Sequence, residues 1–249
     1  MINKKLLQWL NLITFIAAVI INYLAISLPL GYGSTQQLSD DIPNLFVPAG
    51  LTFSIWGIIY ILLGVFSVYQ LRDIFKSEKT EMPYLGKISY FFIISNLANF
   101  SWILLWHYKL IPLSLVAMLI ILLSLLLIYI RLDIGKTEVS RTVKIAVNAP
   151  FSVYLGWITV ATIANVTAVL ADPFGLFKLA PYDLLAEILT ILVIAVAVVI
   201  TYLMLFLRKD WVYSLVIVWA ILGIFLKKSG LIAITALVAV IIVIVGIIY

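Results

Sequence analysis

Long apolar segments recur along the whole chain and restrict its fold more than any other feature. They alternate with short segments that carry charges, Pro or Gly. A helix of about 20 apolar residues crosses the roughly 30 Å hydrocarbon layer of a bilayer. The pattern predicts membrane helices at residues 6–29, 47–70, 85–107, 111–132, 143–170, 182–207, 211–226 and 230–249. Seven is the alternative count, because 211–226 is short and the lysine pair that follows is unusual for a membrane helix hairpin.

Composition decides whether these apolar segments form the core of a soluble protein or cross a bilayer. Of the 249 residues, 65% are hydrophobic and 11% are charged, whereas an average soluble domain has about 25% charged residues. So few charges could not cover a water-soluble particle of this size. The sequence therefore predicts an all-α, polytopic transmembrane bundle of about eight helices with the lipid bilayer as its surroundings.

Several functions are excluded or disfavoured by what the sequence lacks. There is no cysteine, so disulfides and thiolate chemistry are absent, and the single His107 cannot form a multi-histidine metal site. His107 is interpreted as a solvated residue at the end of the third helix. No long basic tail suggests a nucleic-acid partner. The N-terminus is interpreted as an uncleaved first membrane helix, because no small-residue cleavage site follows it.

The basic residues predict the orientation in the membrane. Lys and Arg concentrate in loops on the cytoplasmic side of membrane proteins. With eight helices and the N-terminus inside, most of them fall in cytoplasmic segments, and both termini are predicted to be cytoplasmic. The exceptions on the outer side are Lys109, Lys178, Lys227 and Lys228.

Polar and aromatic residues inside the predicted helices share faces at helical spacing. The second helix carries Phe53, Trp56 and Tyr60. The others follow in two groups: Asn96, Asn99, Trp102 and Trp106 on the third helix, and Tyr154, Trp157, Ala161 and Asn165 on the fifth, after a bend expected at Pro150. One interpretation is helix packing, in which asparagines bond across helices. Tryptophans at helix ends are interpreted as membrane-interface anchors, namely Trp9, Trp106 and Trp211.

The alternative interpretation is a binding pocket. Trp56, Trp102 and Trp157 lie deeper in their helices, where an indole N–H needs an acceptor. Three such rings on three helices, with asparagines between them, predict an amphipathic pocket for a large flat ligand.

The segment "LFVPAGLTFSIWGIIY" resembles the TspO/MBR family, also called tryptophan-rich sensory proteins or translocator proteins. In that family a W-T-P-P-G loop is followed by a deep Trp and an aromatic residue one turn later. Pro48 matches the second proline, and Trp56 and Tyr60 match the two aromatic positions. Leu45 and Val47 stand where the family has its loop tryptophan and first proline.

Two further helices carry the resemblance. Asn99 and Trp102 match the family's N-x-x-W on helix three. Tyr154, Trp157 and Asn165 match its Y-x-x-W and following Asn on helix five, although Val153 replaces the usual proline.

The resemblance implies a five-helix bundle over residues 1–170 with a ligand cavity beneath the loop between helices one and two. Residues 182–249 would then be three appended helices, as in long bacterial members. It also implies a bacterial cytoplasmic membrane location, a lipophilic small-molecule ligand and the option of a homodimer. No covalent cofactor is expected; a tetrapyrrole such as a porphyrin, or a sterol-like lipid, is the implied ligand, with transport, sensing or light-dependent breakdown as proposed roles. The implied ligand-binding residues are Pro48, Phe53, Trp56, Tyr60, Asn99, Trp102, Tyr154, Trp157 and Asn165.

Two other functions remain open at this stage. A proton- or cation-coupled carrier would use Glu187, Asn148 and Asn165 along a polar path through all helices. A structural partner subunit would use its apolar last helices only for docking. No catalytic residues are predicted, because the sequence contains no paired carboxylates and no nucleophile with a base beside it.

Overall fold

The computed structural model describes residues 3–28, 30–78, 80–171 and 184–249. Every regular element in these ranges is helical, which confirms the predicted all-α fold. Four parts of the predictions lie outside the described ranges. They are residue 29 at the end of the predicted first helix, Lys79, residues 172–181 of the predicted loop at 171–181 with Lys178, and residues 182 and 183 of the predicted sixth helix.

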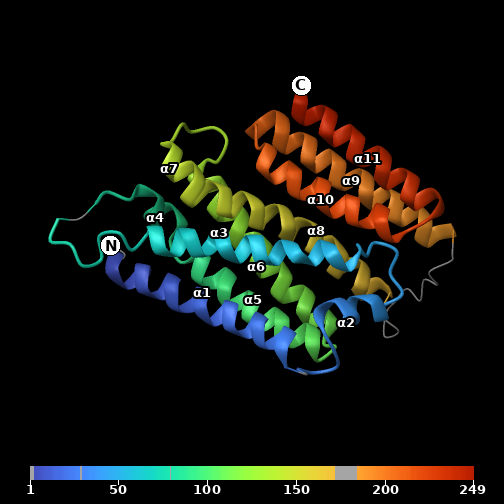
Figure 1. Ribbon diagram of the computed structural model, residues 1–249, viewed down its shortest axis with the longest axis horizontal. Coiled ribbons are helices and arrows are strands. Elements are labelled where there is room, and N and C mark those ends of the chain that lie inside the picture. Colours follow the sequence, from blue (N-terminus) through green and yellow to red (C-terminus); the bar gives the residue numbers. More distant parts are fainter. Residues whose placement is uncertain (1–2, 29, 79, 172–183) are drawn as a thin grey trace.

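In the described part of the chain, eight apolar helices overlap the eight predicted ranges (Figure 1). Six are long and apolar enough to cross a bilayer: α1 (Lys4–Ser27), α3 (Ile55–Tyr69) with the preceding 3-10 turn η1 (Gly50–Ser54), α6 (Ile111–Leu132), α8 (Ala149–Ala171), α9 (Leu184–Arg208) and α11 (Gly230–Ile248). The other two, α5 (Phe91–His107) and α10 (Trp211–Lys227), are apolar but shorter. The chain is an integral membrane protein with a polytopic helical bundle.

Successive apolar helices run in alternating directions, so both termini lie at one end of the bundle (Figure 1). The short helix α2 (Thr35–Asp41) lies at the other end. The even number of crossings that the sequence predicts would put the termini on the same side of a membrane. Which side is cytoplasmic stays a prediction from the basic residues.

Two predicted helices are interrupted. The range 85–107 divides into α4 (Pro83–Ile88) and α5, because Ser89 between them has a positive φ of 52°, which no right-handed helix allows. The range 143–170 begins with a single turn, α7 (Arg141–Val143), and a π-helical turn, η2 (Lys144–Asn148). The π turn directly precedes Pro150, which has no N–H to donate to the preceding helical turn.

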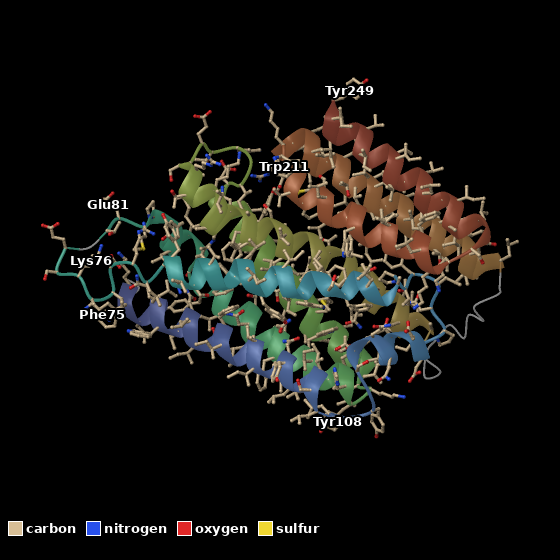
Figure 2. All side chains as sticks on the ribbon, in the orientation of Figure 1. Phe75, Lys76, Glu81, Tyr108, Trp211 and Tyr249 are labelled. Atoms are coloured by element: carbon tan, nitrogen blue, oxygen red, sulfur yellow. The ribbon has the colours of Figure 1, made fainter. Side chains whose placement is uncertain are left out.

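The outer surface of the bundle is apolar along its length, with charged side chains at its ends (Figure 2). Lys76 and Glu81 project from the loop between α3 and α4, and Trp211 lies at the start of α10 (Figure 2). Trp9 and Trp211 are exposed near helix starts, the position that interface anchors occupy.

A buried polar cluster ties α1 to the end of α3. The Asn11 amide donates to Gln70 Oε1 at 2.8 Å, and Gln8 Nε2 donates to Asp73 Oδ1 at 3.0 Å. Lys4 Nζ forms an ion pair with Asp73 Oδ2 at 2.6 Å. Burial raises the pKa of the Asp73 carboxyl, but the hydrogen bonds from Lys4, Gln8 and the Thr80 N–H outweigh it and lower that pKa to about 2.

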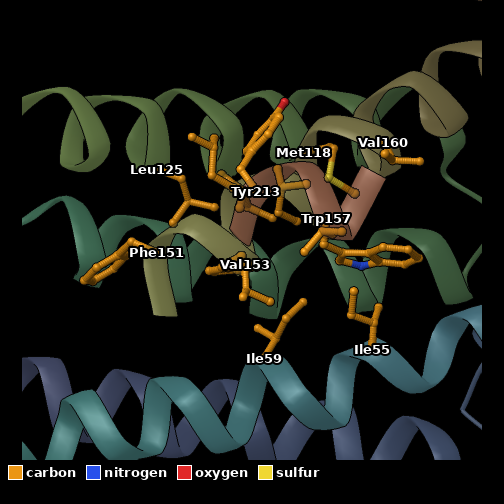
Figure 3. Packing of buried hydrophobic residues seen from close by; sticks show 14 of the residues in the cluster. Ile55, Ile59, Met118, Leu125, Phe151, Val153, Trp157, Val160 and Tyr213 are labelled. Carbon is orange, nitrogen blue, oxygen red and sulfur yellow. The ribbon is translucent and has the colours of Figure 1, made fainter. Parts of the chain in front are cut away.

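The last three helices pack on the rest of the bundle through α10, which contacts α8, α9 and α11. Gly156 allows α8 and α10 to approach closely, since a Cβ there would lie 3.0 Å from Val216 Cβ. At the start of α10, the buried Asp210 carboxylate accepts hydrogen bonds from Tyr129 at 2.8 Å and Ser152 at 2.7 Å. Apolar side chains of α3, α6, α8 and α10 fill the centre (Figure 3).

Candidate functional site

A lid, defined as residues 30–49, covers the end of the bundle opposite the termini. It contains α2, whose start is fixed by a capping box: Ser34 Oγ accepts from Gln37 N–H, and Gln37 Oε1 accepts from Ser34 N–H. Trp106 of α5 donates its indole N–H to Thr35 O at 3.3 Å. The lid is therefore an ordered element bonded to the helix end below it.

His107 is part of this attachment. Its side chain is fully buried, with Nε2 3.0 Å from Thr35 Oγ1 and Nδ1 3.2 Å from Leu30 O. Its backbone carbonyl accepts from Tyr32 N–H. The interpretation of His107 as a solvated boundary residue was wrong, because the lid covers it and lid atoms lie within hydrogen-bond distance of both ring nitrogens.

Asn44 attaches the other end of the lid to α8. Its side-chain amide donates to Thr167 Oγ1 at 2.7 Å, and its Oδ1 accepts from Phe46 N–H at 2.9 Å. Its backbone carbonyl accepts from Lys228 Nζ at 3.1 Å. One lid residue is thus bonded both to α8 and to the turn that follows α10.

A cavity lies directly beneath the lid, between α3, α5 and α8. Four of the seven tryptophans of the chain contribute to its wall. The wall includes Pro48, Phe53, Trp56, Trp102, Trp106, Trp157 and Asn165. The free space is about 50 Å³, room for a few water molecules at about 10–15 Å³ each. We call it the tryptophan cavity.

Trp56 is the centre of the aromatic cluster. Its ring lies 6.3 Å from Trp102 in a stacked arrangement and 6.1 Å from Trp157 in an edge-on arrangement. Tyr60 stacks on Trp56 at 5.6 Å, and Tyr154 meets its edge at 6.2 Å. Rings from three helices therefore converge on one point instead of facing the lipid.

A second set of ring contacts extends the cluster along the cavity wall. Trp106 stacks on Trp102 at 5.7 Å, and Phe53 meets the edge of Trp157 at 6.1 Å. Trp157 lies among the packed side chains between α3 and α8, with Ile55 and Val160 near its ring (Figure 3). The wall is continuous from the start of α3 to the end of α5.

The indole of Trp102 has the acceptor that the sequence predicted it to need. Its Nε1–H donates to Asn165 Oδ1 at 3.0 Å, and Asn165 Nδ2 donates to Ser114 Oγ at 3.1 Å. This chain links α5, α8 and α6 in the buried interior. Asn165 thus orients Trp102 in the cavity wall, since an indole N–H in a membrane interior is costly to leave unpaired.

Three other buried donors of the cluster make no hydrogen bond of normal geometry: Trp157 Nε1, Tyr60 Oη and Asn99 Nδ2. Asn99 Oδ1 accepts from Asn22 of α1 at 2.7 Å. Buried polar groups without partners cost about 1–3 kcal/mol each. In a native protein they mark places where water or a ligand supplies the missing partner.

The structure separates the predicted site residues into two layers. Pro48, Phe53, Trp56, Trp102, Trp157 and Asn165 line the cavity. Tyr60, Asn99 and Tyr154 are not part of its wall. They lie behind Trp56, where the two tyrosines contact its ring and Asn99 lies beside both of them.

Sequence reasoning missed part of the wall. Trp106 was interpreted as an interface anchor, but it is buried and lines the cavity. Its spacing of four residues from Trp102 was the available signal. The small residues Ala164 and Ala168 continue the face of Ala161 on α8 and give the cavity its width. The lid residues Thr35, Ser39 and Asn44 gave no signal in the sequence.

Helix α10 supports the lid side of the cavity from outside. Trp219 Nε1 donates to Thr52 O at 3.0 Å, and Ala49 N–H donates to Gly223 O at 2.9 Å. A Cβ on Gly223 would lie 2.0 Å from Thr52 Oγ1 and 2.9 Å from Pro48 Cβ. The position therefore requires glycine, and the C-terminal helices are in direct contact with the segment that carries Pro48.

The residues of a carrier path lie far apart. Asn165 lines the tryptophan cavity, whereas Asn148 lines a pocket near the start of α8, about 25 Å away along the helix. Glu187 lies in the first turn of α9. Among the described residues, no group of three or more His, Asp or Glu side chains is arranged to hold a metal ion.

The sequence matches the family described as TSPO-like protein over residues 8–249, a range that includes α9, α10 and α11 as well as the first five apolar helices. No curated protein and no solved structure matched the chain. With an all-helical membrane bundle and a match over almost its whole length, the chain belongs to the TSPO-like protein family.

Proposed function

We propose that this protein is a membrane receptor for a flat lipophilic molecule, of which a porphyrin or another tetrapyrrole is the first candidate. The ligand lies in the tryptophan cavity, with its ring against the indoles of Trp56 and Trp157. Aromatic walls of this kind suit planar ligands because ring faces stack and ring edges meet neighbouring faces.

The observation that carries the proposal is the convergence of four tryptophans around one enclosed space. Trp102 and Trp106 are fixed by hydrogen bonds to Asn165 and Thr35. Trp157 keeps a buried N–H with no partner. A rigid apolar wall with one unused donor is suited to bind an apolar ring that carries an acceptor.

The ligand requires the cavity to expand. A space of about 50 Å³ is below the roughly 300–1,000 Å³ of small-molecule sites. Displacement of the lid is the simplest route, because the lid residues Thr35, Ser39 and Asn44 form one end of the cavity wall. Binding then proceeds by opening of the lid, insertion of the ring and closure over it.

Tryptophan fluorescence titrated with a porphyrin tests the proposal in detergent micelles, with protein-free micelles as the blank. Trp157→Phe keeps an aromatic ring but removes the N–H. We expect a loss of affinity of about 3–10-fold, the value of one hydrogen bond to a buried donor. Trp56→Ala removes the central ring and is expected to abolish saturable quenching.

Trp9→Phe is the matched control, since Trp9 contacts Phe75 at the opposite end of the bundle. Its affinity is expected to equal that of the wild type. Equal affinity in the wild type, Trp157→Phe and Trp56→Ala would show that the porphyrin binds elsewhere or only to the micelle, and would overturn the proposal.

A further inference from the structure

A second cavity, which we call the lysine pocket, lies between the lid and the turn that joins α10 to α11. It has a volume of about 410 Å³ and is lined by polar groups from both elements. Lys227, Lys228 and Ser229 come from the turn, and Asp40 comes from the lid. The two lysines are the pair that did not fit the distribution of basic residues expected from the cytoplasmic-loop rule.

The lysine pocket and the tryptophan cavity share a wall. Ser39, Ile42 and Asn44 of the lid line both of them. A molecule in one cavity is therefore separated from the other only by the chain segment that must move for a ring to enter. A ligand longer than the tryptophan cavity would reach the lysine pocket.

The two lysines of the lysine pocket differ in their partners. Lys227 forms an ion pair with Asp40, and the neighbouring Asp41 faces Lys109 at 3.7 Å. Lys228 Nζ donates to the neutral carbonyl of Asn44 at 3.1 Å. No carboxylate in the described part of the chain lies within ion-pair distance of Lys228.

The surroundings of Lys228 favour an added negative charge. Burial lowers the pKa of its ammonium group, and the positive charge of Lys227 lowers it further, against an opposing effect of Asp40. The pocket also contains Ser229, the N-cap of the 19-residue helix α11, whose side chain makes no capping hydrogen bond. Uncapped N–H groups at a helix start add partial positive charge.

We propose that the lysine pocket binds the acidic group of the ligand whose ring lies in the tryptophan cavity. Lys228 is the principal contact, and Lys227 and the first turn of α11 add to the positive field. This inference rests on the proposed function and narrows its ligand class to flat lipophiles that carry a carboxylate at one edge. It also gives the C-terminal helices a part in recognition.

The test compares protoporphyrin, which carries two carboxylates, with its dimethyl ester, which has the same ring without the charges. For Lys228→Gln we expect the affinity for the acid to fall by about tenfold, the scale of one charge-assisted hydrogen bond. The affinity for the ester should be unchanged. In the wild type, added salt should weaken binding of the acid more than that of the ester.

Lys109→Gln is the control, because Lys109 faces Asp41 of the same lid but does not line the pocket. It should leave both affinities unchanged. If Lys228→Gln lost equal affinity for the acid and the ester, Lys228 would only hold the lid in place. If neither affinity changed, Lys228 would have no role in binding. Either result overturns the inference. A third outcome would reject this inference alone. If the wild type bound acid and ester equally well and Trp56→Ala lost binding of the ester, the proposed function would stand without a role for the lysine pocket.

Discussion

The side-chain amide of Asn44 in the lid donates a hydrogen bond to Thr167 Oγ1 of α8 at 2.7 Å. Asn44 also lies where the tryptophan cavity, the lysine pocket and a groove between α8 and α9 meet. This hydrogen bond therefore holds the residue that separates three spaces against α8. Its strength should set how readily the lid opens.

Thr167→Val keeps the shape of the side chain but removes the acceptor for Asn44. We expect porphyrin quenching to become about fivefold faster, since one neutral hydrogen bond contributes about 1 kcal/mol. Stopped-flow fluorescence measures this rate. Thr190→Val is the control, because its hydroxyl donates to Ala186 O of its own helix. Equal rates in both variants would show that opening of the lid does not limit binding.

Asn165→Leu should destabilise the protein because it removes the acceptor of the Trp102 indole. The unpaired buried N–H costs about 1–3 kcal/mol, and we expect a lower midpoint of thermal unfolding in micelles, followed by near-ultraviolet circular dichroism. Ser101→Ala is the control, since Ser101 is exposed and donates to Leu97 O of its own helix. A midpoint equal to that of the control would contradict the assigned role of Asn165.

Gly223→Ala should force α10 away from η1, because the added Cβ would lie 2.0 Å from Thr52 Oγ1. Overpacking of this kind costs about 1–3 kcal/mol. Gly57→Ala provides the comparison, since a Cβ there meets no atom within 4 Å, and alanine in a helix is about 0.5–1 kcal/mol better than glycine. The thermal midpoint should fall for Gly223→Ala and stay or rise for Gly57→Ala.

Asp73 should make stability depend on acid pH. Its folded pKa is lowered to about 2, below the ordinary value of about 3.9. The stabilising contribution is therefore complete above about pH 4 and is lost as the pH falls through about 2. In Asp73→Asn, the midpoint of thermal unfolding should fall less between these two pH values than it does in the wild type. Asp41→Asn, at an exposed ion pair, should leave that loss unchanged.

The membrane bundle and much of the cavity wall could be predicted because both follow from local patterns. Helical spacing placed Trp102 and Asn99 on one side of α5, and Trp157 and Asn165 on one side of α8, without knowledge of the contacts between helices. The hydrogen bond of Trp102 to Asn165 was predictable in kind, because a buried indole N–H needs an acceptor.

The rest depends on contacts between distant segments. Trp106 and His107 lie at a helix end, where residues usually meet the interface, but the lid covers them. The lid mixes polar and apolar residues, and no periodicity in it predicted that Asn44 would bond to α8. The division of the chain near residue 170 stays a prediction, and the family match extends across it.

The bonds from Trp219 and Gly223 to the segment Ala49–Thr52 have a consequence for biosynthesis. Thr52 and Trp219 are separated by 167 residues in the sequence. The ribosome therefore makes the segment that carries Pro48 long before it makes α10, the helix that contacts this segment. A nascent chain that has inserted only its first five apolar helices still lacks these partners. The segment that carries Pro48 thus gains its outer support only after α10 has been made.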